Sequence, residues 1–126
     1  MASSWTGGTP EHPIVVTPAK GRVEVSWKGA TVVQSDAALD LKEASYPAVK
    51  YLPRADADMS LLRRTDHKTH CPYKGDASYY SILVDGQVSE NAVWSYEAPL
   101  RGMEGIKDYL AFYPNRVDRI EEAATP

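Results

Sequence analysis

The strongest constraint on the fold of this chain is the segment SYYSILVDGQVSENAVWSY, residues 78–96. Two runs with alternating side-chain character flank Asp85-Gly86, and that dipeptide is a preferred two-residue β-hairpin turn. Opposed residues of a hairpin share one face of the sheet. The segment therefore predicts a hairpin with the pairs Leu83–Val88, Ser81–Glu90, Tyr79–Ala92 and Ala77–Trp94.

One face of this hairpin is aromatic. By register it holds Ala77, Tyr79, Ser81, Leu83, Glu90, Trp94 and Tyr96. The aromatic side chains form either part of the core or the wall of a ligand pocket, and the pattern leaves both interpretations open. The polar pair Ser81 and Glu90 favours a pocket, because a buried carboxylate is costly unless it is paired.

The remaining segments also indicate short strands. RVEVSWKGATVVQS has period-two alternation around Lys28-Gly29, which predicts a second hairpin. YPAVKYLP is framed by prolines and is typical of a short edge strand, whereas DAALDLKEA fits a helical turn or a strand equally well. Asp58 is placed to cap one helical turn. We expect a second turn over residues 103–106, a strand through residues 110–112 and a last strand in NRVDRIEE, giving seven to nine strands in a mainly β fold.

Length and composition describe one small domain. The chain has 126 residues and a net charge of -3. We expect one domain over residues 13–120, with flexible tails at 1–12 and 121–126. The charge distribution has no basic stripe, which argues against nucleic-acid binding, and no apolar run is long enough to span a membrane. One cysteine and no apolar leader favour a cytoplasmic location.

The segment CPYKG, residues 71–75, raises the question of a reactive centre. Cys71 is the only cysteine, and Lys74 supplies a cation that would favour a thiolate. The alternative is structural: Pro72 fixes one φ angle, Gly75 accepts a positive one, and Cys71 is a small residue at the start of a turn. We interpret the segment as a turn first, and keep Cys71 and Lys74 as candidate catalytic groups. Lys74 is also a candidate to receive an anion beside the Gly75 amide.

Two further patterns fit metal chemistry less well. A metal site at His67, His70 and Cys71 is not expected, because His67 and His70 are three residues apart and lie on opposite faces of a strand. Asp56-x-Asp58 has the carboxylate spacing of nucleotidyl transfer, which holds two magnesium ions. That chemistry also needs an upstream Gly-Ser turn, and the chain contains no Gly-Ser, so a polar loop with a helix cap is the better interpretation.

Four blocks carry a resemblance to a known family. They are YPAVKYLPRADADMSLL, CPYKGDASYYSI, ENAVWSYEAP and YLAFYPNRVD, and in this order and spacing they resemble domain of unknown function 427. The resemblance implies a β-tent, with two antiparallel sheets meeting at one edge, as in the thalidomide-binding domain of cereblon and methionine sulfoxide reductase B. Those relatives hold zinc with two Cys-x-x-Cys pairs, so a single cysteine implies a metal-free tent. The family is sometimes labelled as a nucleotidyltransferase, but the residues of this chain do not support that activity.

These observations lead to a functional hypothesis. We expect a small-molecule-binding module whose pocket is formed by Tyr79, Trp94, Tyr96, Lys74, Ser81 and Glu90, without a cofactor. The ligand would be flat, and uncharged or anionic. The alternative is an enzyme that uses Cys71 or Lys74. Uncovered edge strands also leave assembly into an oligomer open.

Overall fold

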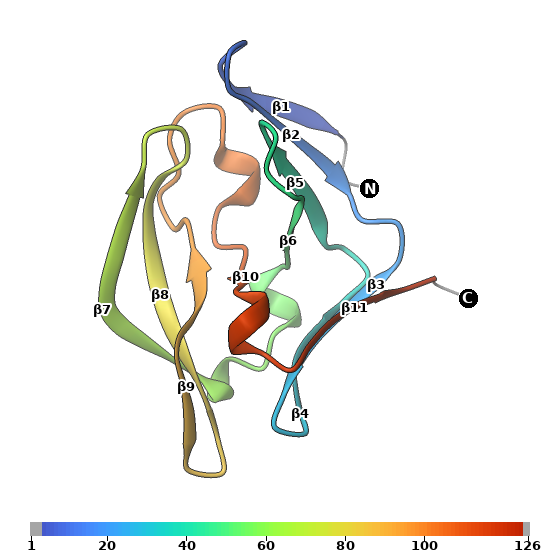
Figure 1. The fold of residues 1–126 in the computed structure, drawn as a ribbon, viewed down its shortest axis with the longest axis vertical. Helices are drawn as coiled ribbons and strands as arrows, with labels where there is room; N and C mark the ends of the chain where they lie inside the picture. The colour runs from blue at the N-terminus through green and yellow to red at the C-terminus, as the bar shows by residue number, and fades with distance from the viewer. Residues whose placement is uncertain (1–3, 125–126) are drawn as a thin grey trace.

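The chain folds almost entirely as short β-strands (Figure 1). The computed structural model describes residues 4–124. In that range the strands are β1 (Trp5–Gly8), β2 (Pro13–Pro18), β3 (Arg22–Trp27), β4 (Ala30–Ser35), β5 (Leu39–Glu43), β6 (Val49–Tyr51), β7 (Leu62–Cys71), β8 (Gly75–Val84), β9 (Gln87–Ser95), β10 (Ala111–Phe112) and β11 (Arg119–Ala123). The 3₁₀ turns are η1 (Arg54–Asp56), η2 (Met59–Leu61), η3 (Glu104–Ile106) and η4 (Pro114–Arg116). The mainly β class is confirmed, with more strands and more helical turns than predicted.

The strands within residues 4–124 form three antiparallel sheets. We call β1-β2-β5-β6 the first sheet, β11-β3-β4 the second and β10-β9-β8-β7 the third. Leu52 and Leu110 exchange two backbone hydrogen bonds of 2.8 Å, which join the edge of the first sheet to the edge of the third. This junction matches the expected meeting of two sheets at one edge. The second sheet is an addition to that expectation, and it exists because β11 returns from the end of the chain to pair with β3.

Both predicted hairpin turns are present. Lys28 and Gly29 have φ angles of 51° and 81°, and Asp85 and Gly86 have φ angles of 49° and 78°. Positive φ at both central residues defines the turn that matches the twist of a hairpin. The segment DAALDLKEA, left open by the sequence, contains strand β5. Asp58 caps η2 by accepting a hydrogen bond from the Ser60 backbone amide, as predicted.

A bulge corrects the predicted pairing of β8 with β9. Leu83 pairs with Val88 as expected, but the register shifts between Tyr80 and Ile82, so that Tyr79 lies opposite Trp94. Asn91 has a φ of 50°, a conformation that asparagine tolerates, and its backbone amide donates to Ser81 Oγ across 3.0 Å. A bulge of this kind cannot be recognised from alternation alone. The predicted pairs Ser81–Glu90, Tyr79–Ala92 and Ala77–Trp94 are therefore wrong.

The N-terminal segment is more ordered than predicted. Trp5–Gly8, expected in a flexible tail, form β1 and pair with β2. The ring of Trp5 lies against Gly105, where a Cβ atom would sit 2.5 Å from it, so this contact anchors the strand. Met1, Ala2 and Ser3 lie outside the described residues. At the other end, β11 continues to Ala123, past the predicted boundary at 120.

Two core clusters fill the space between the sheets. One consists mainly of residues of the second and third sheets, and it includes Val25, Trp27 and Ile82. The other joins the first sheet to the third and includes Leu41 and Tyr79. Ladder hydrogen bonds and these two clusters hold the framework around the site. Within residues 4–124 no helix is long and apolar enough to cross a bilayer.

Candidate functional site

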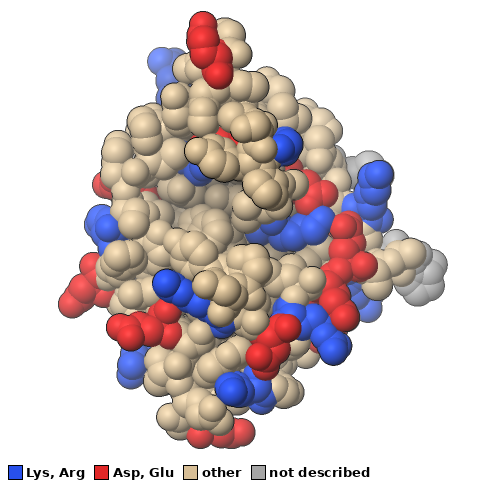
Figure 2. All heavy atoms as spheres, viewed as in Figure 1, with Lys and Arg blue, Asp and Glu red and all other residues tan. Residues whose placement is uncertain are grey.

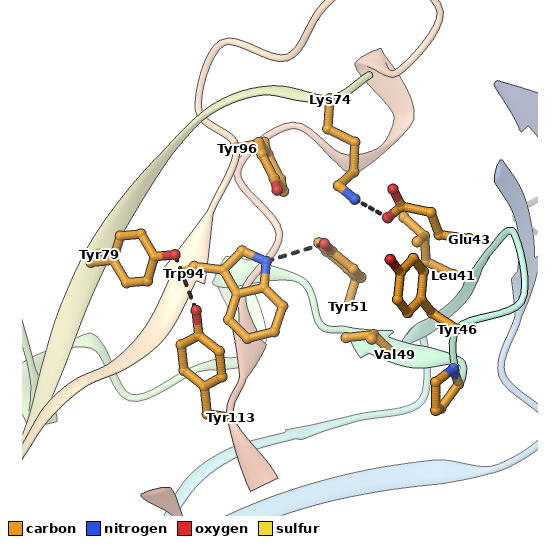
Figure 3. Close-up of a pocket in the computed structure, with 11 residues that line it drawn as sticks. Leu41, Glu43, Tyr46, Val49, Tyr51, Lys74, Tyr79, Trp94, Tyr96 and Tyr113 are labelled. Atoms are coloured by element: carbon orange, nitrogen blue, oxygen red, sulfur yellow. Dashed lines mark hydrogen bonds and ion pairs between the residues drawn. The ribbon is translucent and has the colours of Figure 1, made fainter. Parts of the chain in front are cut away.

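A cavity of about 290 Å³ lies between the first and third sheets. Figure 2 shows a hollow near the centre of one face, with acidic and basic side chains intermixed around it. Six aromatic side chains contribute to the cavity wall, and Figure 3 shows them converging from both sheets. The lining residues are Leu41, Glu43, Tyr46, Pro47, Val49, Tyr51, Lys74, Tyr79, Trp94, Tyr96 and Tyr113.

Trp94 is the central element of the wall. Its ring centroid lies 4.6 Å from that of Tyr113, and it meets Tyr51 edge-on at 6.3 Å. The indole Nε1 donates a hydrogen bond to the Tyr51 hydroxyl across 3.2 Å. Trp94 is half-buried and packs against the edge of the core. The aromatic face is therefore part of the core on one side and a cavity wall on the other.

A chain of hydroxyl groups supports the third-sheet side of the cavity. Tyr79 Oη lies 2.9 Å from Thr69 Oγ1 and 3.1 Å from Tyr113 Oη. The ring of His67 packs edge-on against Tyr79, with centroids 4.4 Å apart. Burial and the hydrogen bond with Tyr79 raise the pKa of Tyr113 to about 12. Tyr113 is therefore neutral at physiological pH, and the hydrogen bond between Tyr79 and Tyr113 fixes the orientation of both side chains.

Unlike Tyr51, Tyr79 and Tyr113, Tyr96 has an unused hydroxyl group. Among residues 4–124, every fully buried side-chain nitrogen or oxygen has a hydrogen-bond partner. The Tyr96 hydroxyl makes no hydrogen bond to these residues, so it must be in contact with the open space. Figure 3 shows it pointing between Trp94, Tyr51 and Lys74. Burial raises the pKa of Tyr96 far above its ordinary value, so this group is a neutral hydrogen-bond donor at the cavity surface.

Lys74 and Glu43 form an ion pair at one end of the cavity (Figure 3). Lys74 is only 7% exposed. Glu43 Oε2 lies 2.7 Å from His12 Nε2, and the His12 ring stacks on Tyr73 with centroids 4.1 Å apart. Burial would raise the pKa of Glu43, but its hydrogen bonds with Lys74 and His12 outweigh burial and lower the pKa. Glu43 therefore already neutralises the charge of Lys74, the residue that the sequence offered as a candidate to receive an anion.

The structure brings together four of the six residues predicted to line a pocket. Lys74, Tyr79, Trp94 and Tyr96 all line the cavity. Ser81 and Glu90 do not. Ser81 is buried and bonded to the bulge at Asn91, and Glu90 is exposed. The bulge separates Ser81 and Glu90 from the aromatic face. The two polar side chains that suggested a pocket therefore do not line the cavity.

Sequence reasoning missed the half of the site that comes from the first sheet. Tyr46 follows β5 and is 63% exposed, and Tyr51 ends β6. Tyr113 follows β10. The unusual number of tyrosines was the available signal, with eight Tyr against one Phe. Composition does not indicate which tyrosines converge, because that depends on how the sheets meet.

The other candidate residues lie apart from the cavity wall. Cys71 ends β7, pairs with Gly75 and is half-buried against the core, and it does not line the cavity. Gly75 has a φ of 110°, as the turn interpretation required. His70 pairs with Asp76 at the surface, 2.7 Å away. No group of three or more His, Cys, Asp or Glu residues within the described range is arranged to hold a metal ion.

The acidic motif also has a local explanation. Asp58 caps η2, and Asp56 accepts a hydrogen bond of 2.6 Å from Ser35 Oγ. Each carboxylate thus has a structural partner. The structure gives no support for a two-metal arrangement at this motif.

Comparison with known proteins agrees with the resemblance seen in the sequence. Residues 15–123 match the model of the family described as a domain of unknown function (DUF427), and the chain belongs to that family. No curated protein matches the sequence. The family description carries no activity, so the functional argument depends on the geometry of the cavity.

Proposed function

We propose that this protein binds a small, planar, uncharged molecule in the cavity between the first and third sheets, without covalent chemistry. The observation that supports this most directly is the half-buried indole of Trp94 beside an open space into which the unpaired Tyr96 hydroxyl points. Small-molecule sites are typically concave, largely apolar or aromatic, and equipped with a few oriented polar groups. The cavity has all of these features.

The wall chemistry favours a flat ligand. Trp94 packs edge-on against Tyr51 and at a tilt against Tyr113, so its ring is supported by both tyrosines. Aromatic walls held in this way bury a planar ring with little loss of side-chain freedom. A saturated ring of the same size is thicker and makes poorer contact with such a surface.

The charge at the site favours an uncharged ligand. The Lys74 ammonium and the Glu43 carboxylate neutralise each other at the cavity wall. A ligand with a net charge would have to be desolvated without an unpaired counter-ion, which is costly. The Tyr96 hydroxyl instead offers one hydrogen bond to a neutral acceptor such as an amide oxygen. These points favour binding over nucleophilic chemistry, since Lys74 is paired and Cys71 does not line the cavity.

The test uses three compounds of matched size, namely benzamide, benzoate and cyclohexanecarboxamide. Binding is followed by the indole N–H signals of the three tryptophans in nitrogen-15 NMR spectra, with Trp94→Phe identifying the signal of Trp94. We expect benzamide to shift that signal saturably. Benzoate should bind more weakly because of its charge, and cyclohexanecarboxamide because of its shape. A Trp94 signal that none of the three moves would contradict the proposal.

A pair of variants tests the hydroxyl. Tyr96→Phe removes the unpaired donor and keeps the ring, so the dissociation constant for benzamide should rise roughly five- to tenfold. Tyr109→Phe is the control, because Tyr109 packs against the core cluster that contains Tyr96 but is only half-buried and does not line the cavity. Its affinity for benzamide should stay within twofold of the wild type. Equal effects of the two variants would contradict the role of Tyr96.

A further inference from the structure

A second cavity adjoins the first. It has a volume of about 310 Å³, and its wall is mainly apolar. Residues from all three sheets or their connections contribute to it, namely Val25, Leu52, Phe112, Pro114 and Ile120. It contrasts with the first cavity, whose wall carries tyrosine hydroxyls and an ion pair.

The two cavities share Val49 and Trp94 as lining residues. Val49 is half-buried on β6, an edge strand of only three residues, and Trp94 is half-buried on β9. The partition between the cavities is therefore made by two side chains that are not sealed in the core. Each cavity alone is near the lower limit of about 300 Å³ for ligand sites, whereas the two together lie well inside the usual range.

Among the described residues, Lys50 is the one ionisable side chain that lines the second cavity. Its ammonium is paired with Asp40 on one side and with Glu122 on β11 on the other, at 2.5 and 2.7 Å. Lys50 therefore has no free charge to offer an anionic group. The aliphatic part of a paired lysine side chain covers apolar surface. The wall of the second cavity therefore favours a neutral, apolar occupant.

We infer that the ligand is amphipathic, with a planar polar head in the first cavity and an apolar tail that passes Val49 and Trp94 into the second. This inference rests on the proposed function, since it extends the ligand from the same site. The head contacts the Tyr96 hydroxyl and the aromatic wall. The tail contacts Leu52, Phe112 and Ile120, and the shared Trp94 ring lies between head and tail.

The experiment uses benzamide and its 4-ethyl, 4-butyl and 4-hexyl derivatives, which keep one head and lengthen one tail. In the wild type, each added methylene that enters the second cavity should lower the dissociation constant by up to roughly fourfold. Ala48→Phe adds bulk at an exposed lining residue of the second cavity. The dissociation constant of this variant for benzamide should stay within twofold of the wild-type value. Its affinity should not increase when the alkyl chain is lengthened.

Two controls separate this effect from general hydrophobic binding. Ala55→Phe places the same added ring at an exposed position that lines neither cavity. In this variant the affinity should still increase with alkyl chain length, as in the wild type. Tyr96→Phe should weaken all four compounds by the same factor. A gain that persists unchanged in Ala48→Phe would overturn the inference, as would the absence of any gain in the wild type.

Methyl NMR signals of the wild-type protein test the position of the tail directly, and they do not require Ala48→Phe to fold. The 4-hexyl compound should shift the methyl signals of Val25, Leu52 and Ile120, which benzamide should leave in place. Methyl signals that respond to neither compound would overturn the inference. If benzamide moves the Trp94 signal but the tails add nothing, only the inference fails, whereas an unmoved Trp94 signal contradicts the proposed function itself.

Discussion

The indole Nε1 of Trp94 donates a hydrogen bond to the hydroxyl oxygen of Tyr51 across 3.2 Å, and this bond connects the third sheet with the first. The two residues are 43 positions apart in the chain. Tyr51 is only 2% exposed, and burial raises its pKa far above the ordinary value, so the acceptor is a neutral hydroxyl. One contact thus fixes a wall of the cavity and helps to hold two sheets together.

Tyr51→Phe should destabilise the protein by about 1–2 kcal/mol, because it leaves the indole N–H without its acceptor in a partly buried place. The measurement is the midpoint of urea unfolding followed by circular dichroism. Tyr109→Phe provides the control, since it removes a tyrosine hydroxyl that makes no hydrogen bond to the described residues. Equal midpoints for the two variants would contradict a role of the Trp94–Tyr51 bond in joining the sheets.

Gly86→Val should destabilise the protein by about 1–3 kcal/mol, since a β-branched residue resists the positive φ of the turn. Gly86 has a φ of 78°, and a Cβ atom there would meet no atom within 4 Å. The cost therefore comes from backbone conformation and not from a clash. Gly86→Asn tests this reason directly, because asparagine tolerates this conformation and should cost less. Similar unfolding midpoints for Gly86→Val and Gly86→Asn would show that backbone conformation is not the cause of the lost stability.

Glu97 should make the protein sensitive to acid. Burial would raise its pKa, but hydrogen bonds from Tyr80 and Arg64 outweigh burial and lower the pKa to about 2, from an ordinary value of 4.5. A carboxyl whose pKa is lower in the folded state stabilises the fold fully above its unfolded pKa. That contribution is lost as the pH falls from about 4.5 to about 2.

The measurement is the unfolding midpoint of the wild type and of Glu97→Gln at several pH values between 2 and 6. The wild type should lose stability more steeply than the variant over the range in which Glu97 becomes protonated. Glu90→Gln is the control, because the exposed Glu90 carboxylate makes no ion pair within the described residues. If the unfolding midpoints of the wild type and Glu97→Gln fall equally with pH, protonation of Glu97 is not the cause of the acid sensitivity.

Cys71→Ser should fold, and it should bind benzamide as the wild type does. The turn after β7 depends on Pro72 and on the positive φ of Gly75, neither of which needs a thiol. A maleimide reagent at neutral pH should label Cys71 of the wild type more slowly than free cysteine, because its side chain is half-buried against the core. Faster labelling than free cysteine would support the enzyme hypothesis.

Local chemistry in the sequence was sufficient to predict much of the fold. Both two-residue turns, the cap at Asp58 and the edge strand between Pro47 and Pro53 are confirmed. These features depend on residues within a few positions of one another. The strand at Trp5–Gly8 was missed because its stability comes from pairing with β2 and from the contact of Trp5 with Gly105, which is far away in the chain.

Alternation along the hairpin is enough to predict that Tyr79, Trp94 and Tyr96 share one face, and a register shift of two residues preserves this. The contact of this face with Tyr51, the pairing of Lys74 with Glu43 and the displacement of Glu90 by the bulge appear only in the folded protein. The physical reason is that contacts between sheets depend on long-range packing, which no local pattern encodes.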